Sequence, residues 1–220
     1  MDDDVQQQVR TAARAVAHAG LSDAFGHVSA RASRSSLLIT PAIPLGSMTD
    51  DHELLSLDLA TEELPVDAPR ETWMHLAVLR ARADVQAVCR AQPRSVSAWA
   101  SLHLPLPVLY GHAALLGAVG AYNDSRLVRD PAAAEGVVFA LGSASAVILR
   151  GNGALTVGKS VAHAVAAMWV LERSAELALR AAGAAVPHEL PEVEREWWHD
   201  RADELLPRVY RHLVDESIAR

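Results

Sequence analysis

Two side chains that can exchange protons, Glu71 and His75, stand four residues apart in a segment with apolar residues at helical spacing. Residues four apart on a helix share one face, so the carboxylate and the imidazole can lie side by side. An apolar segment typical of a strand follows, and Arg90 stands at its end. We therefore expect the Arg90 guanidinium to come near the same face. A carboxylate, an imidazole and a fixed positive charge together suit proton transfer beside a bound anion.

These residues must be positioned by a mixture of helices and strands. Apolar residues at helical spacing, with acidic or Ser caps and Gly or Pro stops, predict several helices. They are expected from Val5 to about Gly20, from Pro69 to about Ala83, briefly from Pro93, from about Pro131 to Leu141, from Ser160 to about Ala182, and as one helix or two short ones after Pro191. Short β-rich segments predict strands. These are HVSAR, SLLIT, ELLSLDL, VQAVC and SAVILR, the last followed by a hairpin turn at Gly151-Asn152-Gly153.

The order of these elements lacks a strict βαβ alternation, which favours a largely antiparallel sheet between helical layers, an α/β sandwich. With 220 residues, half of them apolar, the chain fits one domain spanning residues 1–220. The net charge of -7 argues against partners such as nucleic acid or anionic membranes. No apolar run is long enough to span a bilayer, and the acidic start is unlike a secretory signal, so a cytoplasmic protein is expected.

Four segments resemble, in order and spacing, the class II aldolase/adducin family along nearly the whole chain. They are GHVSAR, LLITPAIPLGSMTDDHELLSLDL, PRETWMHLAVLRARADVQAVCRAQP and AVILRGNGALTVGKSVAHAVAAMWVLERSAELAL. Within that family, three features look more like the branch of dihydroxyphthalate-type decarboxylases. They are GHVS, the absence of Ser-Gly after Ile39-Thr40-Pro41, and the segment YGHAALLG. The resemblance implies an αβα fold and a carbon–carbon lyase site at a subunit interface, commonly in a homotetramer.

The family's chemistry uses a divalent metal held by a His-x-His pair at a strand end and by a third histidine in a His-Gly turn. By resemblance, these positions hold Arg90, Gln92 and Asn152 in this chain. All three replacements remove an imidazole, and arginine has no acceptor atom and would repel a cation. The resemblance therefore implies that the zinc site is lost and that no cofactor is bound.

The family's general acid/base glutamate is retained, because Glu71 aligns with it. His27 stands where other members have an asparagine that helps to hold substrate, and by the same resemblance His112 could face the cavity or be a surface loop residue. The loop that begins at Thr40-Pro41 lacks the Ser and Gly groups that hold phosphate in sugar-phosphate aldolases. The resemblance therefore implies a non-phosphorylated substrate.

Most of these residues also have a purely structural explanation. Glu71 could be a solvated first-turn acid, and His75 an ordinary helix residue paired with it. Arg90 could be an exposed strand-end residue, and Gln92 could cap the next helix. Asn152 could simply favour the tight hairpin turn.

We therefore predict a metal-independent carbon–carbon lyase, of decarboxylase, aldolase or elimination type, that acts on a small non-phosphorylated carboxylate or carbonyl compound. Catalytic roles are predicted for Glu71, His27 and Arg90, and substrate contacts for His75, His112, Gln92, Asn152 and Thr40. One alternative is a catalytically silent member that serves as a binding or scaffold protein. The other is a metal-dependent enzyme with substitute ligands, drawn from His27, His75, His112 and Glu71, although their spacing matches no compact ligand motif.

Overall fold

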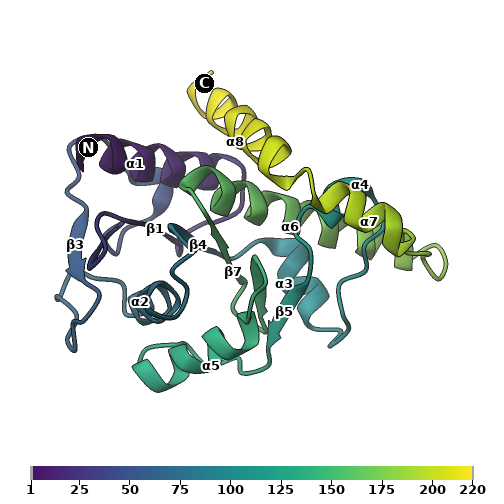
Figure 1. Ribbon diagram of the computed structural model, residues 1–220, viewed down its shortest axis with the longest axis horizontal. Helices are drawn as coiled ribbons and strands as arrows, with labels where there is room; N and C mark the ends of the chain where they lie inside the picture. Colours follow the sequence, from purple (N-terminus) through teal and green to yellow (C-terminus); the bar gives the residue numbers. More distant parts are fainter. Residues whose placement is uncertain (1, 220) are drawn as a thin grey trace.

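A seven-stranded sheet forms the centre of the computed structural model, which describes residues 2–219 (Figure 1). The strands follow the spatial order β3-β2-β1-β4-β7-β6-β5, and every neighbouring pair is antiparallel except β5 and β6. The predicted, largely antiparallel sheet is confirmed. The strands are β1 His27–Arg31, β2 Ser36–Ile39, β3 Leu55–Asp58, β4 Ala87–Ala91, β5 Val119–Tyr122, β6 Ala146–Leu149 and β7 Ala154–Gly158.

Helices cover both faces of this sheet and complete the predicted sandwich (Figure 1). One face carries α1 Asp2–His18, α3 Arg94–Ala100 and α6 Val161–Ala182, with α8 Ala202–Ile218 packed outside α1 and α6. The other face carries α2 Thr72–Ala81 and α5 Pro131–Leu141. Two short helices, α4 Gly111–Ala114 and α7 Glu192–His199, pack together, and η1 Leu45–Ser47 is a single 3₁₀ turn. Within residues 2–219, no helix combines the length and apolar character needed to cross a bilayer.

Each face of the sheet has its own apolar core, because successive strand side chains point to opposite faces. In β4, Ala87, Cys89 and Ala91 belong to the core beneath α1 and α6. Val88 belongs to the core beneath α2 and α5. The same alternation places Arg90 on the α2 side of the sheet. Burial raises the pKa of the Cys89 thiol to about 12, which agrees with the unreactive role that its apolar segment indicates.

Most predicted elements are present, with three differences. β4 begins and ends two residues later than VQAVC, so Arg90 lies within the strand rather than at its end. The chain after Pro191 forms one short helix, α7, and one long helix, α8. The third difference is that α4 and β5 were not predicted. The four residues of β5, VGAY, include a glycine and an alanine, so their pattern is too short and too weak for a strand signal.

The predicted hairpin between β6 and β7 turns at Gly151-Asn152-Gly153. Gly151 and Gly153 adopt φ values of +71° and +81°, which residues with a Cβ rarely adopt. The amide of Asn152 donates to the carbonyl of Leu149 at 2.8 Å and closes the turn. A Cβ on Gly153 would lie 2.7 Å from Cα of Gln92 and would overlap the carbonyl oxygen of Ala91. Glycine at 153 therefore lets the turn approach the end of β4.

Replacing Gly153 with alanine should destabilise the fold more than the same change at Gly20. Gly20 has a φ of +68° and open space where an added methyl group would stand, so Gly20→Ala costs only the backbone strain, about 1–2 kcal/mol. Gly153→Ala adds an overlap with backbone atoms, which should cost about 1–3 kcal/mol more. Urea denaturation of both variants measures the difference. Equal losses of unfolding free energy would contradict the close approach of the turn to β4.

Candidate active site

Arg90 occupies the middle of the sheet, although its guanidinium is a permanent charge. Its Cα pairs with that of His27 in β1 and with that of Leu155 in β7. Only 1% of Arg90 is exposed, so the alternative of a solvent-exposed strand end is wrong. Within residues 2–219, no carboxylate oxygen lies within 4.0 Å of its guanidinium nitrogens. The charge is therefore buried without a direct ionic partner, which is costly unless something else compensates for it.

The three positions that resemble the family's metal ligands do come together. The terminal Nη2 of Arg90 donates to the backbone oxygen of Asn152 at 3.3 Å and also to its side-chain oxygen. Nε2 of Gln92 donates to that same side-chain oxygen at 3.1 Å. Asn152 is thus more than a turn former, because its buried side chain joins β4 to the β6–β7 hairpin. Gln92 does not cap α3: its amide is directed to Asn152, and the first-turn amides of Ser95 and Val96 donate instead to the carboxylate of Glu172.

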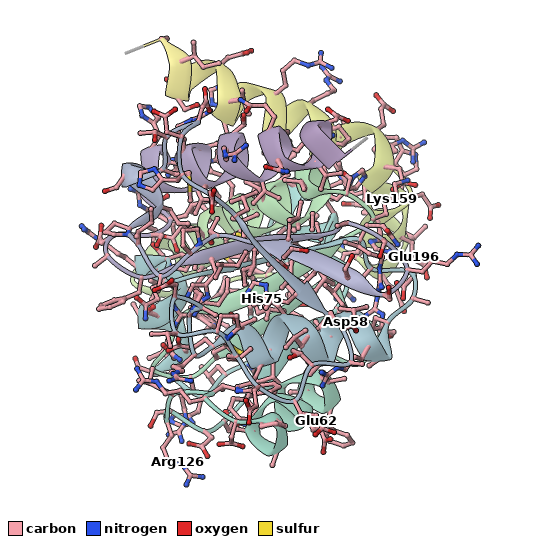
Figure 2. The ribbon with its side chains drawn as sticks, turned by 90° about the vertical axis from the view of Figure 1, so that its left-hand side faces the viewer. Asp58, Glu62, His75, Arg126, Lys159 and Glu196 are labelled. Atoms are coloured by element: carbon pink, nitrogen blue, oxygen red, sulfur yellow. The ribbon has the colours of Figure 1, made fainter. Side chains whose placement is uncertain are left out.

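His27 and His75 lie next to Arg90 on the α2 side of the sheet, in the interior of the molecule. Figure 2 shows His75 there, whereas Glu62 and Arg126 lie at the periphery. The two imidazole rings are 5.7 Å apart between centroids, and His75 Nδ1 lies 2.7 Å from the hydroxyl of Ser29. His75 is therefore fixed by β1 through Ser29, a residue that was not predicted. Only strand alternation, which places Ser29 on the same face as His27, could have indicated it.

Both imidazoles are neutral at ordinary pH. Burial lowers the pKa of His75 to about 3, and the positive charge of Arg90 acts in the same direction. Burial also holds the pKa of His27 well below its usual value, with further contributions from His75 and Arg90. Burial lowers the pKa of Arg90 as well, while the negative charge of Glu71 opposes that change. The buried part of the site thus holds one positive charge, that of Arg90, with the carboxylate of Glu71 as its anionic neighbour.

Glu71 stands at the first turn of α2 without capping it, so its carboxylate is free for other contacts. Oε1 lies 3.7 Å from Nε of Arg129, and 13% of the Glu71 side chain is exposed, against 57% for Arg129. A fully solvated first-turn acid does not fit this burial. Arg129 was not predicted either, because it comes from the loop before α5 and no local pattern marks it. These two residues form the side of the cluster nearest to solvent.

Unsatisfied hydrogen-bonding atoms gather around this cluster. Eight buried side-chain nitrogen or oxygen atoms of the described residues have no hydrogen-bond partner, and five of them lie here. Such an orphan typically costs about 1–3 kcal/mol, so a concentration of them points to a ligand that completes their bonding. The five are Nδ1 of His27, Oγ1 of Thr72, Nε2 of His75, Nε of Arg90 and Nδ2 of Asn152.

The two remaining predicted site residues, Thr40 and His112, lie in different surroundings. Thr40 is fully buried, and its hydroxyl accepts from the amide of Val28 at 3.3 Å, which ties β2 to β1 beside His27. His112 is exposed on α4, and its ring packs against Tyr110 and Trp198 at 5.6 and 5.8 Å between centroids. The structure of this single chain therefore does not bring His112 to the cluster around Arg90.

The residues at the family's metal positions do not fit a zinc ion. Arg90 offers only donors, and the side-chain oxygen of Asn152 already accepts hydrogen bonds from Arg90 and Gln92. Zinc needs imidazole, thiolate or carboxylate ligands. Across residues 2–219, His, Cys, Asp and Glu side chains nowhere gather in a group of three that could hold a metal ion. What the arrangement can do is hold an anion against Arg90, with Glu71 placed to move a proton.

Known proteins resemble this chain in both sequence and fold. Two proteins named 3,4-dihydroxyphthalate decarboxylase are similar in sequence. The one from Arthrobacter keyseri is 31% identical and covers 81% of this chain and 79% of its own length. The one from Terrabacter sp. strain DBF63 is 33% identical and covers 81% of this chain and 82% of its own length. The predicted likeness to this branch is confirmed.

Solved structures show the same fold. An L-fuculose 1-phosphate aldolase from Glaciozyma antarctica PI12 aligns with a TM-score of 0.81 at 21% identity, over 98% of this chain and 92% of that one. The sequence profile described as Class II Aldolase and Adducin N-terminal domain matches residues 7–179, most of the chain. With the sheet, its helical layers and these relatives in agreement, the chain belongs to the class II aldolase and adducin family.

Proposed function

We propose that this chain is a metal-independent lyase that decarboxylates a small, non-phosphorylated carboxylate compound at Arg90. The observation that carries the proposal is the buried guanidinium of Arg90, which has no carboxylate within ion-pair distance in the described residues and an unpartnered Nε. The relatives named as decarboxylases support the lyase class. We further propose that the enzyme works as a homo-oligomer, most simply a tetramer, in the cytoplasm.

A substrate carboxylate or enolate oxygen would supply what the site lacks. Arginine binds carboxylates through paired N–H donors, and such charge-assisted bonds are about twice as strong as neutral ones. The amide Nδ2 of Asn152 and the free Nε of Arg90 are both donors without partners, so an oxygen-rich anion could accept from both. The nearby neutral imidazoles add hydrogen-bonding atoms without adding positive charge. The site therefore favours one anionic group with neutral polar neighbours.

Decarboxylation breaks a carbon–carbon bond, releases CO₂ and leaves the electron pair on the remaining carbon. That pair must be delocalised onto a conjugated oxygen, and a proton must then reach the carbon. Arg90 would stabilise the developing negative oxygen, the role that a divalent metal has elsewhere in the family. Glu71 would pass the proton from solvent to the carbon, because its side chain lies on the solvent side of the cluster beside Arg129. His27 and His75 would orient the substrate by hydrogen bonding.

Removing the Arg90 charge should abolish most of the activity while leaving the fold intact. We expect purified, exhaustively chelated protein to release CO₂ from 3,4-dihydroxyphthalate or a related hydroxylated aromatic dicarboxylate at its full rate. Arg90→Met should lower kcat about 10²–10³-fold, the usual effect of losing an oxyanion donor. The kcat of Arg90→Lys should lie between those of the wild type and Arg90→Met, because lysine keeps the positive charge but lacks the planar pair of N–H donors. Arg211→Gln, at an exposed position on α8, is the control.

Two results would count against this proposal. If chelation removes the activity and zinc restores it, the enzyme depends on metal. If the intact protein releases CO₂ from none of a panel of aromatic and aliphatic carboxylates, the catalytically silent alternative is favoured. Circular dichroism and denaturation of Arg90→Met distinguish loss of chemistry from loss of fold, because replacing a buried charge by an apolar side chain of similar length is often tolerated.

The neutral histidines predict that the fold loses stability as the pH falls. In the unfolded chain, histidine takes up a proton near its ordinary pKa of 6.5, whereas His75 in the fold does so only at about 3. Below pH 6.5 the unfolded state therefore binds more protons, and each such histidine should cost about 1.4 kcal/mol per pH unit. Urea denaturation at several pH values between about 6 and 4.5, below the unfolded pKa and above the folded one, measures this slope.

Replacing one of these histidines measures how much it contributes to the dependence of the unfolding free energy on pH. His75→Asn should make the slope shallower by about 1.4 kcal/mol per pH unit, and His27→Asn should do the same. His163 stays in all variants, so the lowering of its pKa by burial cancels in the comparison. His188→Asn, at an exposed position, is the control and should leave the slope unchanged. An unchanged slope in both His75→Asn and His27→Asn would show that these imidazoles are not held neutral.

A further inference from the structure

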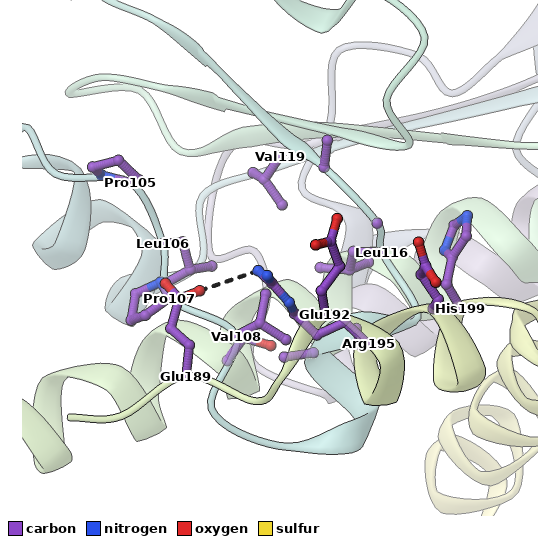
Figure 3. Close-up of a pocket in the computed structure, with 16 residues that line it drawn as sticks. Pro105, Leu106, Pro107, Val108, Leu116, Val119, Glu189, Glu192, Arg195 and His199 are labelled. Atoms are coloured by element: carbon purple, nitrogen blue, oxygen red, sulfur yellow. Dashed lines mark hydrogen bonds and ion pairs between the residues drawn. The ribbon is translucent and has the colours of Figure 1, made fainter.

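The cavity in Figure 3 needs few hydrogen bonds from a ligand. It lies apart from the Arg90 cluster, between the chain that runs from Pro105 to Val119 and helix α7, and its volume is about 530 Å³. Of the eight buried, unpartnered atoms of the described residues, only Nε of Arg195 belongs to its lining. The guanidinium of Arg195 already pairs with Glu189 at 3.1 Å, as the dashed line marks. The missing hydrogen bonds gather instead at the Arg90 cluster, so a ligand is expected there.

Within that cluster, the hydroxyl of Ser29 has a single hydrogen-bond partner, Nδ1 of His75 at 2.7 Å. Ser29 is 0% exposed, so solvent does not reach the hydroxyl, and no other atom of residues 2–219 bonds to it. A hydroxyl has one proton to donate. If Nδ1 of His75 donated to Ser29, that proton would be buried without an acceptor, which costs stability. The arrangement therefore favours Ser29 as the donor and Nδ1 of His75 as the acceptor.

The direction of this hydrogen bond decides which nitrogen of His75 carries the proton. Burial lowers the pKa of His75 to about 3, so the ring is neutral and has one N–H donor and one acceptor. With Nδ1 as the acceptor, the proton is on Nε2. That nitrogen is buried and has no hydrogen-bond partner among the described residues. His75 therefore presents a free N–H donor in the interior of the molecule.

Two neighbours in the cluster also present free donors. Nε of Arg90 is buried without a partner and can only donate. Nδ2 of Asn152 is free as well, because the side-chain oxygen of Asn152 is the atom that accepts from Arg90 and Gln92. Donors cannot bond to one another, which explains why all three nitrogens are unpartnered although they belong to one cluster. The three groups lack an acceptor, and an anionic oxygen would supply it.

We propose that Ser29 is a positioning residue: it fixes His75 in the tautomer that is protonated at Nε2, and His75 then donates a hydrogen bond to the anionic oxygen held by Arg90. This inference rests on the proposed function, because it takes the ligand of Arg90 to be an oxyanion. His75 keeps its proton throughout, and Glu71 remains the group that moves one. The bond from a fixed neutral donor strengthens as negative charge develops on the oxygen, so His75 acts together with Arg90 in the transition state.

Nitrogen NMR of the full-length protein with isotopically labelled histidine tests the tautomer. The protonated and unprotonated nitrogens of a neutral imidazole give well-separated signals, and His75→Asn identifies those of His75 by their loss. In the wild type, His75 should be protonated at Nε2 near neutral pH. Ser29→Ala should give a mixture of both tautomers, because neither nitrogen then has a partner, and Ser29→Thr, which restores a hydroxyl, should return the wild-type signals. Ser56→Ala, at an exposed position of β3 in the same sheet, is the matched control and should leave them unchanged.

Titration with phthalate tests the hydrogen bond to the anion. Phthalate has carboxylates but lacks the hydroxyl oxygens that would delocalise the electron pair, so it should bind without losing CO₂. It should shift the Nε2 signal of His75 saturably, and Arg90→Met should weaken this binding about tenfold or more.

A proton on Nδ1 in the wild type, an unchanged tautomer in Ser29→Ala, or an Nε2 signal that phthalate does not move would each overturn the proposal. The proposed decarboxylation fails separately. CO₂ release by a protein whose His75 is protonated at Nδ1 would contradict only the role of Ser29 and His75. An Nε2 proton that responds to phthalate in a protein that releases no CO₂ would contradict only the reaction.

Discussion

The contact between Arg90 and Asn152 is the constraint on which the rest of the site depends. A guanidinium that is 1% exposed must be hydrogen-bonded, and Asn152 supplies both a backbone and a side-chain oxygen to it. That arrangement requires the β6–β7 turn to lie against the end of β4, which in turn requires glycine at 153. Burial of the Arg90 charge therefore depends on the position of the turn, and the position of the turn depends on Gly153.

The sheet places polar residues where apolar ones would ordinarily lie. On the α2 face, β1 and β4 carry His27, Ser29 and Arg90 in place of core residues, while the rest of that face packs apolar side chains such as Val88 and Leu155. Burying polar groups in this position costs stability unless they find partners. Proteins retain such costs mainly at functional sites, and the unpartnered nitrogens of His27, His75 and Arg90 fit that expectation.

Local patterns were sufficient to predict most of the fold. Apolar periodicity and caps located α1, α5 and α6, because each of these helices is long and has a clear start or stop signal. They were insufficient for β5, which is held by its pairing with β6 rather than by its own composition. The likeness to a known family placed Glu71, Arg90 and Asn152 at one site, which spacing alone could not do, since these residues are far apart in the sequence.

The sequence did not indicate which side chains each site residue contacts. His75 was expected beside Glu71, four residues earlier, but it bonds to Ser29 on another element, and Glu71 instead faces Arg129. These contacts arise from packing α2 and the loop before α5 against the sheet. His112 lies on α4 beside Trp198, and this contact depends on how the C-terminal helices pack against α4. No local sequence signal indicates that packing.

The shared oxygen of Asn152 also bears on how this chain could change during evolution. A histidine introduced at 152 alone would remove the side-chain oxygen that Arg90 and Gln92 share, and would leave a buried guanidinium facing a new imidazole. A histidine at 90 alone would find a single amide oxygen and a glutamine, too few ligands for zinc. Each of these single changes breaks a hydrogen bond that depends on the side-chain oxygen of Asn152, so the effects of substitutions at positions 90, 92 and 152 should not be additive. We therefore expect these three positions to change together in related chains.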